Sequence, residues 1–223
     1  MADRSKHEQA YATIRERILD GTYGPGYRLV IDGLARELGI SAVPIREAIR
    51  RLEAEGWILF QRNVGAQIMP LTAERWQATM EVLATLEGRA TASSAPHLSP
   101  DEIARARGFN KEMETALESL DLLLFGRLNR GFHAVLHGRC PNPYLTGLLR
   151  QTFERLDVMR RSVFIYIPLR GWASLSEHSE LVDAIEEQPG GELIERLVRQ
   201  HVQNTIDAFL EHDRAQLKTR VEG

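Results

Sequence analysis

Apolar residues recur at helical spacing along most of the chain, but the first seventy residues follow a more varied pattern than the rest. Between Glu8 and Leu19 the apolar positions lie three or four residues apart, which predicts a helix. The following "DGTYGPGYRL" ends that helix with three glycines and a proline. The next run, "IDGLARELG", predicts a short helix with Asp32 as its N-cap and Gly39 as its C-terminal stop.

A third helix and a hairpin are expected next. Ser41 can cap this helix, and it is expected to stop at Gly56. Its apolar positions follow i, i+3, i+4, i+7 spacing and are Ile45, Ala48, Ile49 and Leu52. The runs Trp57–Phe60 and Ala66–Met69 then predict two strands around a turn. Three short helices followed by a β-hairpin are typical of a winged helix-turn-helix, here residues 1–71.

After Pro70 the pattern is helical to the end of the chain, which predicts an all-α bundle over residues 72–223. The breaks are "SAPHLSP", "GRCPNPY", "IPLRGW" and "QPGG". The expected helices lie near 72–95, 99–120, 121–138, 143–165, 172–187 and 190–213. The fold class is therefore mainly α, with the small winged domain at the N-terminus.

Composition excludes several classes of protein. The 223 residues are 43% hydrophobic and 26% charged, as in ordinary globular proteins, and contain no run of eighteen apolar residues that would predict a membrane span. The N-terminus lacks the apolar core of a secretory signal, and Cys140 is the single cysteine, so a cytoplasmic protein without disulfides is expected. Net charge is -3, yet residues 1–70 carry ten Lys and Arg against nine Asp and Glu. A local basic surface is compatible with this distribution.

The third helix presents arginines on the face opposite its apolar positions. With the apolar side packed inward, Ala42, Arg46 and Arg50 line up one turn apart, and Arg51 lies beside them. The guanidinium fork can bind phosphate or a guanine edge in the major groove. A solvated face is the alternative, since Glu47, Glu53 and Glu55 offset the arginines. The turn residues Gln61, Arg62 and Asn63 are either wing contacts to DNA or a plain polar turn.

The run "LARELGISAVPIREAIRRLEAEGW", residues 34–57, closely resembles the GntR family of bacterial transcription regulators. This resemblance implies that Ser41, Arg46, Arg50 and the wing glycine, Gly65, contact DNA. The family usually has arginine and threonine after the serine, whereas this chain has Ala42 and Val43. Loss of that arginine removes about 1–3 kcal/mol of base discrimination, so the operator sequence of relatives does not carry over.

Histidines on separate helices are the second group of candidate functional residues, here for binding a metal ion. "RLNRGFHAVLHG" places Asn129 and His133 on one helix face, and His178 and His201 lie on the apolar flanks of two later helices. Facing helices of a bundle can direct imidazoles at one metal ion. A histidine on such a flank is also commonly a hydrogen-bonded core residue, and the spacing alone does not decide between these alternatives.

The motifs "NRGFH", "NPYL", "SEH" and "RQH" occur in the order found in the FadR-like branch of the GntR family, which carries a C-terminal FCD domain. This resemblance implies a metal site made by Asn129, His133, His178 and His201. His137 is a poorer candidate, because it lies beside a glycine at a helix end. Zinc, nickel, iron or manganese would all suit these ligands.

Many relatives have aspartate where this chain has Asn129. Three neutral imidazoles and an amide leave the charge of a divalent ion uncompensated, so we expect weaker metal binding and a preference for a small carboxylate effector. Leu83 also stands where relatives often place an arginine facing the ligand pocket. The residues that could supply a replacement charge are Arg89, Arg160 and Arg161, and the favoured alternative for each is an ordinary surface arginine.

These patterns together predict a metabolite-responsive transcription regulator that binds a palindromic operator as a homodimer. One alternative is a DNA-binding protein whose helical domain only dimerises and binds no metal. A metal-dependent hydrolase, with Glu177 or Glu180 as the base, is a further alternative. The chain lacks H-E-x-x-H, a nucleophile constellation and a phosphate-binding glycine loop, so we expect no enzyme activity.

Overall fold

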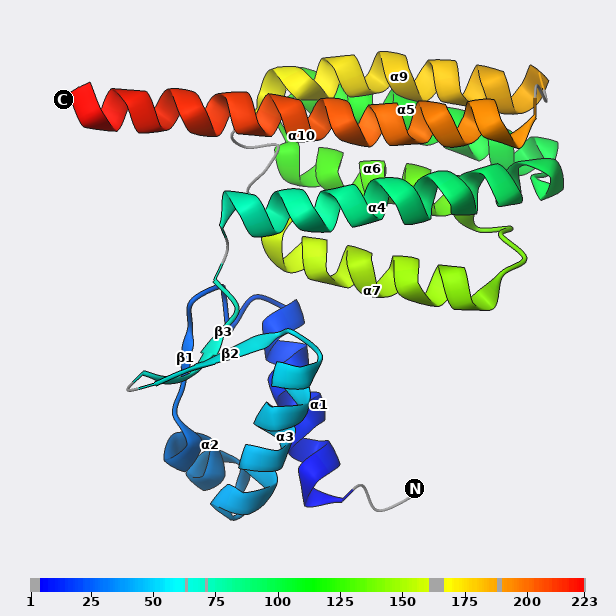
Figure 1. Cartoon of the computed structure of the whole chain (residues 1–223). Coiled ribbons are helices and arrows are strands. Elements are labelled where there is room, and N and C mark those ends of the chain that lie inside the picture. The colour runs from blue at the N-terminus through cyan, green and yellow to red at the C-terminus, as the bar shows by residue number, and fades with distance from the viewer. Residues whose placement is uncertain (1–4, 63, 71, 161–166, 188–189, 223) are drawn as a thin grey trace. The chain divides into compact units, whose positions relative to one another are not determined.

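The computed structural model describes residues 5–62, 64–70, 72–160, 167–187 and 190–222, with the side chains of 159–160 and 217–222 also left undescribed. The chain divides into two compact units (Figure 1). The first is Met1–Thr72 with Asp157–Met159, and the second is Ala73–Leu156 with Arg160–Gly223. Each unit has a hydrophobic core of its own.

The first unit is a winged helix-turn-helix, as predicted. Its elements are α1 (Lys6–Leu19), β1 (Arg28–Leu29), α2 (Ile31–Leu38), α3 (Ala42–Ala54), β2 (Ile58–Gln61) and β3 (Gly65–Ile68). The strands form an antiparallel sheet in the order β1-β3-β2, in which Arg28 faces Gln67 and Ile58 faces Ile68. Ile14, Ile45 and Leu52 are fully buried and join α1 and α3 in one core.

Some details of this unit differ from the sequence-based expectation. Strand β1 was not predicted, because two residues are too few to show an alternating pattern. Asp32 is not the N-cap of α2; Val30 occupies that position without a side-chain hydrogen bond, and Asp32 lies in the first turn. Gly39 ends α2 in the left-handed region with φ 65°, as expected. Ser41 is the N-cap of α3, but its hydroxyl makes no capping hydrogen bond.

The second unit is an all-α bundle. Its elements are α4 (Ala73–Ser94), the short 3-10 helix η1 (Ala95–His97), α5 (Pro100–Glu118), α6 (Leu122–His137), α7 (Pro143–Arg160), α9 (Pro168–Glu187) and α10 (Gly191–Glu222). Contacts run from α4 to α10, then to α9, α5 and α6, and from α6 back to α4 (Figure 1). These five helices therefore enclose a common interior. No helix in the described residues is both long and apolar enough to cross a membrane.

Two helix boundaries of the bundle were predicted wrongly. Helix α9 begins at Pro168, inside the predicted break "IPLRGW", because proline is well suited to the first position of a helix. Helix α10 continues to Glu222, beyond the predicted end at residue 213. The predicted end of the helix near residue 165 lies outside the described residues.

Glycines lie at three of the helix contacts that close this ring. A Cβ atom on Gly88 of α4 would lie 3.0 Å from the backbone oxygen of Glu195 on α10. A Cβ atom on Gly131 of α6 would lie 2.8 Å from Phe109 of α5, and one on Gly171 of α9 would lie 2.7 Å from Leu117 of α5. A larger residue at Gly88 would press on the backbone of α10, whereas at Gly131 and Gly171 the side chains of Phe109 and Leu117 would have to move.

Candidate metal centre and nucleic-acid interface

The interior of the bundle gathers the three predicted histidines. His133 comes from α6, His178 from α9 and His201 from α10, and their candidate ligand atoms all lie within 4.8 Å of one another. All three side chains are buried, His178 completely. The three histidines are far apart in the sequence, but they meet in the interior because each lies on the inward, apolar flank of its helix.

Each histidine has a partner for its Nδ1 atom, and each partner comes from a different helix. Oε1 of Glu87 on α4 lies 2.8 Å from Nδ1 of His133. Oδ1 of Asn110 on α5 lies 3.1 Å from Nδ1 of His178, and Oε2 of Glu177 on α9 lies 2.6 Å from Nδ1 of His201. Partners of this kind orient metal-binding histidines, and they leave the Nε2 atoms for the ion.

The hydrogen bonds of Asn110 determine the tautomer of His178. Its Nδ2 donates to the backbone oxygen of Leu175 and to Oγ of Ser179, both at 3.0 Å, so its Oδ1 faces the imidazole as an acceptor. Nδ1 of His178 must then carry the hydrogen, and Nε2 carries the lone pair. Within the described residues this buried Nε2 atom has no hydrogen-bond partner.

Asn129 supplies a second acceptor of the same kind. It lies one helical turn before His133 on α6, is buried, and its Oδ1 atom has no hydrogen-bond partner in the described part of the chain. A buried acceptor without a donor costs about 1–3 kcal/mol. A cation bound by Oδ1 of Asn129 and Nε2 of His178 would satisfy both atoms. The residues present therefore fit a metal ion.

The electrostatic environment keeps these groups in the protonation states that such a site needs. Burial lowers the pKa of His178 well below its usual value and also lowers the pKa of His201, although Glu177 opposes the shift of His201. Both imidazoles are therefore neutral near pH 7, the form that binds metals. Burial alone would raise the pKa of Glu177, but hydrogen bonds from His201, Arg170 and Asn204 outweigh it and lower this pKa to about 2.

Three residues that contact the clustered histidines were missed by the sequence analysis: Glu87, Asn110 and Arg170. Glu87 is 1% exposed, and it lies one turn after the buried Leu83 on α4. That i, i+4 relation to an apolar position was the signal available in the sequence. The sequence had suggested that nothing would offset the positive charge of a bound ion. In the structure the carboxylates of Glu87 and Glu177 contact the imidazoles of His133 and His201 from behind, so they would offset part of that charge.

The structure does not bring Arg89, a predicted effector residue, to the histidine cluster. Arg89 is 65% exposed, and its Nη1 atom lies 3.8 Å from Glu195. The side chain of Arg160 and all of Arg161 lie outside the described residues. His137 stacks on Phe153, with ring centroids 5.7 Å apart, and is not part of the cluster.

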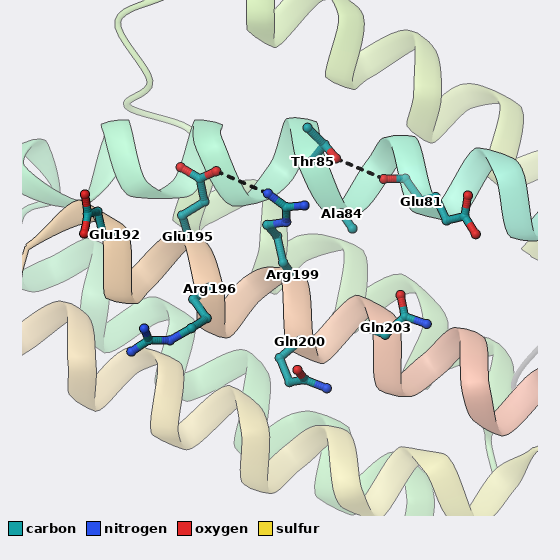
Figure 2. A pocket seen from close by; sticks show the side chains of 9 residues that line it. All are labelled: Glu81, Ala84, Thr85, Glu192, Glu195, Arg196, Arg199, Gln200 and Gln203. Atoms are coloured by element: carbon teal, nitrogen blue, oxygen red, sulfur yellow. Dashed lines mark hydrogen bonds and ion pairs between the residues drawn. The ribbon is translucent and has the colours of Figure 1, made fainter.

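The surface of the bundle has a large hollow between α4 and α10, shown in Figure 2. Its volume is about 660 Å³, and its lining is mainly polar, with Glu81 and Thr85 on one side and Arg199 and Gln203 on the other. None of the three clustered histidines lines it. A second hollow of about 350 Å³, between α5 and α9, is lined by both Asn110 and His178.

The predicted DNA-binding face lies on α3 and the wing. Arg46 and Arg50 are exposed, opposite the buried Ile45 and Ile49, and Ala42 is half-buried on the same side. Ser41 and Arg62 are exposed as well. Gly65 has φ 92°, so this wing position favours glycine for its backbone conformation.

Arg51 differs from the other arginines of α3. Its Nε atom lies 3.1 Å from Oε1 of Glu55, and its guanidinium lies 3.9 Å from the ring centre of Tyr11 on α1. The hydroxyl of Tyr11 in turn donates to Glu55 at 2.8 Å. Arg51 therefore contributes to the packing of α3 against α1, whereas Arg46 and Arg50 are exposed.

Two family models match the chain, and together they span most of it. Residues 6–68 match bacterial regulatory proteins of the gntR family, and residues 78–204 match the FCD domain. The chain belongs to the GntR family of transcriptional regulators that carry an FCD domain. The predictions of family, of fold class and of a regulator rather than an enzyme are confirmed.

Relatives share both domains of this GntR-family regulator. The HTH-type transcriptional regulator YdhC of Bacillus subtilis is 27% identical over 219 residues, covering 96% of this chain and 92% of that protein. The Nta operon transcriptional regulator of Aminobacter aminovorans is 30% identical over 190 residues, covering 85% and 87%. The solved structure of McbR/YncC from Escherichia coli has the same fold, with a TM-score of 0.68 at 20% identity over 94% of this chain and 99% of that one.

Proposed function

We propose that this regulator binds a palindromic DNA operator as a homodimer and responds to a small carboxylate held at a divalent metal ion in its FCD domain. Residues 1–71 would recognise DNA, and residues 72–223 would dimerise and bind the effector. The observation that carries the metal site is the pair of buried acceptors without donors, Nε2 of His178 and Oδ1 of Asn129, beside His133 and His201.

Four side chains would hold the ion: Asn129, His133, His178 and His201. When bound, the ion would supply a positive centre that accepts an anionic ligand. Glu87, Asn110 and Glu177 fix the orientation of the three imidazoles. Imidazole and amide ligands suit zinc, nickel, iron or manganese alike, so the ligand set does not select one of them.

The charge of the surrounding side chains favours a single negative charge on the effector. Near the site Arg170 carries one positive charge, and the carboxylates of Glu87 and Glu177 carry two negative charges. A divalent ion would leave the buried cluster with one net positive charge. Uncompensated charge in a buried site is costly, so a monocarboxylate would complete it.

DNA recognition would use Arg46 and Arg50 of α3, because both are exposed on the face opposite the core. Two copies related by a two-fold axis would present two such helices to half-sites about one helical turn apart. Effector binding between α6, α9 and α10 would favour one arrangement of the bundle and so change the affinity for DNA.

A second candidate is a regulator whose histidines are purely structural. It is favoured by the hydrogen bonds that Asn110 and Glu177 already make to the imidazoles of His178 and His201. It gives no role to Oδ1 of Asn129 or to Nε2 of His178. Metal content therefore separates the two candidates.

The switch is tested by measuring DNA affinity with and without the effector. A DNA site selected from a random duplex library with metal-loaded protein would serve as probe, and a thermal-shift screen of small carboxylates would supply the effector. We expect the selected acid to change DNA affinity about 5- to 150-fold, the usual range of allosteric coupling. Equal affinity at saturating acid would rule out the switch.

Replacement of Asn110 tests the orientation of His178. Asn110→Ala removes the acceptor that holds the Nδ1 hydrogen, so we expect metal affinity to fall by about 10- to 100-fold. Competition with a chromogenic chelator measures this change. Lys111→Ala, at the adjacent position on α5, is the control and should retain full affinity. Unchanged binding in Asn110→Ala would mean that this hydrogen bond does not position the ligand.

A further inference from the structure

A third hollow lies between α6 and α7, outside the histidine cluster. Its volume is about 460 Å³, within the range of small-molecule sites. None of the three clustered histidines lines it. Its lining comes from one face of each helix and includes Arg130, Ala134 and His137 of α6 and Gly147, Arg150 and Phe153 of α7.

Small residues leave the space between these two helices open. Ala134 is exposed on α6. A Cβ atom added to Gly147 of α7 would meet no other side chain and no other helix within 4 Å among the described residues. The ring of five helices around the bundle interior does not include α7. A small molecule could therefore fill the hollow without displacing a helix.

The inner part of the lining is apolar and centres on Phe153. This ring is 5% exposed, and the ring of His137 stacks on it with centroids 5.7 Å apart and planes inclined by 27°. Burial lowers the pKa of His137, so its imidazole is neutral near pH 7. An uncharged surface of aromatic rings favours a ligand with an apolar ring of its own.

The positive charge of the hollow comes from two arginines, one on each helix. Burial lowers the pKa of Arg130, although Glu154 opposes this shift, so a bound anion would stabilise its charged form. The Arg150 side chain is 69% exposed, and its Nη1 atom lies 3.4 Å from Oε1 of Glu154. An exposed ion pair of this kind contributes little to stability, so Arg150 can exchange Glu154 for a ligand.

We propose that this hollow is a second ligand site, which binds an aromatic monocarboxylate without a metal ion. The guanidinium groups of Arg130 and Arg150 would bind the carboxylate, because their planar forks match its geometry. The aromatic ring would lie against Ala134 and Phe153. Two arginines and Glu154 leave one net positive charge, which a single carboxylate neutralises. The site shares no residue with the metal site of the proposed function.

The test compares benzoate, benzamide and acetate on the full chain, prepared both metal-free and metal-loaded. Benzamide has the shape of benzoate without its charge, and acetate has the charge without the ring. Titration followed by NMR measures each affinity. On metal-free protein benzoate should bind at least about tenfold tighter than the other two, because only benzoate combines a charge-assisted contact with a buried ring. Equally tight binding of benzamide or of acetate would overturn the proposal.

Gly147→Leu tests whether benzoate binds in this hollow. The new side chain would occupy the open space, so benzoate affinity for metal-free protein should fall at least about tenfold. Gly126→Leu is the matched control on α6, where an added Cβ atom also meets nothing within 4 Å in the described structure. It should retain full affinity. Melting temperatures of both variants show that they are folded.

Arg130→Gln tests the carboxylate contact. It removes the half-buried charge while keeping a polar side chain, so benzoate affinity should fall about tenfold, and benzamide affinity should stay the same. Arg127→Gln makes the same change at an exposed position on α6 that does not line the hollow. Benzoate should bind this control as tightly as the unaltered protein.

The outcomes separate this inference from the proposed function. Benzoate that binds only metal-loaded protein, or that binds Gly147→Leu with full affinity, contradicts the second site and leaves the metal-carboxylate site standing. Full benzoate affinity in the double variant His133→Gln with His178→Gln supports the second site, whether or not metal binds at the histidines. If benzoate does not bind metal-free protein at all, the second site is wrong.

Discussion

Purified protein carrying both His133→Ala and His178→Ala is expected to contain no stoichiometric metal. These residues come from α6 and α9, so the double variant would leave only His201 and Asn129 of the proposed ligands. Two neutral ligands do not make the four-ligand set expected of a tight site. Elemental analysis after reconstitution and removal of excess metal measures the loss.

The control for this experiment is His137→Ala, which makes the same change on α6, one turn after His133. It should retain metal, since His137 stacks on Phe153 and not on the cluster. His133→Gln with His178→Gln keeps polar side chains near Glu87 and Asn110, so it separates loss of metal from misfolding. Metal-dependent stabilisation should be present in the control and absent from both double variants. Stoichiometric metal in the folded double variants would eliminate the proposed site.

Arg46→Ala and Arg50→Ala are expected to weaken DNA binding strongly. Each removes an exposed guanidinium from the outer face of α3. A bidentate contact to a base is worth about 1–3 kcal/mol, which corresponds to roughly 5- to 150-fold in affinity. Loss of a phosphate contact would instead reduce the slope of log affinity against log salt concentration by about one unit. Fluorescence anisotropy on the selected DNA site, repeated at several salt concentrations, distinguishes these contacts.

Arg127→Ala is the matched control, because Arg127 is an exposed arginine on α6 and its loss changes the net charge equally. Its DNA affinity should remain close to that of the unaltered protein. Ala42→Arg adds an arginine to the same face instead of removing one, and it should alter the DNA sequence selected from a random library. If Arg46→Ala, Arg50→Ala and the control all bind equally well, α3 does not read DNA through this face.

Helical spacing predicted the faces of individual helices well, because burial repeats with the period of the helix itself. It placed Ile45, Ile49 and Leu52 in the core and put His133, His178 and His201 on inward flanks. The partners behind those histidines were not predictable in this way. Asn110 and His178 are 68 residues apart, and only the packing of α5 against α9 brings them together.

Arg170 was missed for a different reason. The segment "IPLRGW" contains a proline and a glycine, and it was interpreted as a break between helices. In the structure Pro168 begins α9, and Gly171 allows α9 to approach Leu117 of α5 closely. Proline and glycine usually end helices, but here Pro168 begins α9 and Gly171 brings it close to α5. Local composition therefore placed Arg170 in a loop, whereas it is buried in a helix.

The three glycine contacts bear on how a signal could travel through the FCD domain. Where Gly88, Gly131 and Gly171 lie, no Cβ atom separates the helix backbone from the neighbouring helix. At these points the glycine backbone packs directly against the neighbouring helix: against Glu195 at Gly88, the ring of Phe109 at Gly131 and the side chain of Leu117 at Gly171. Because the helices are in such close contact, a movement of α9 or α10 would displace α5 and α4 with it, and the domain would change between packed arrangements.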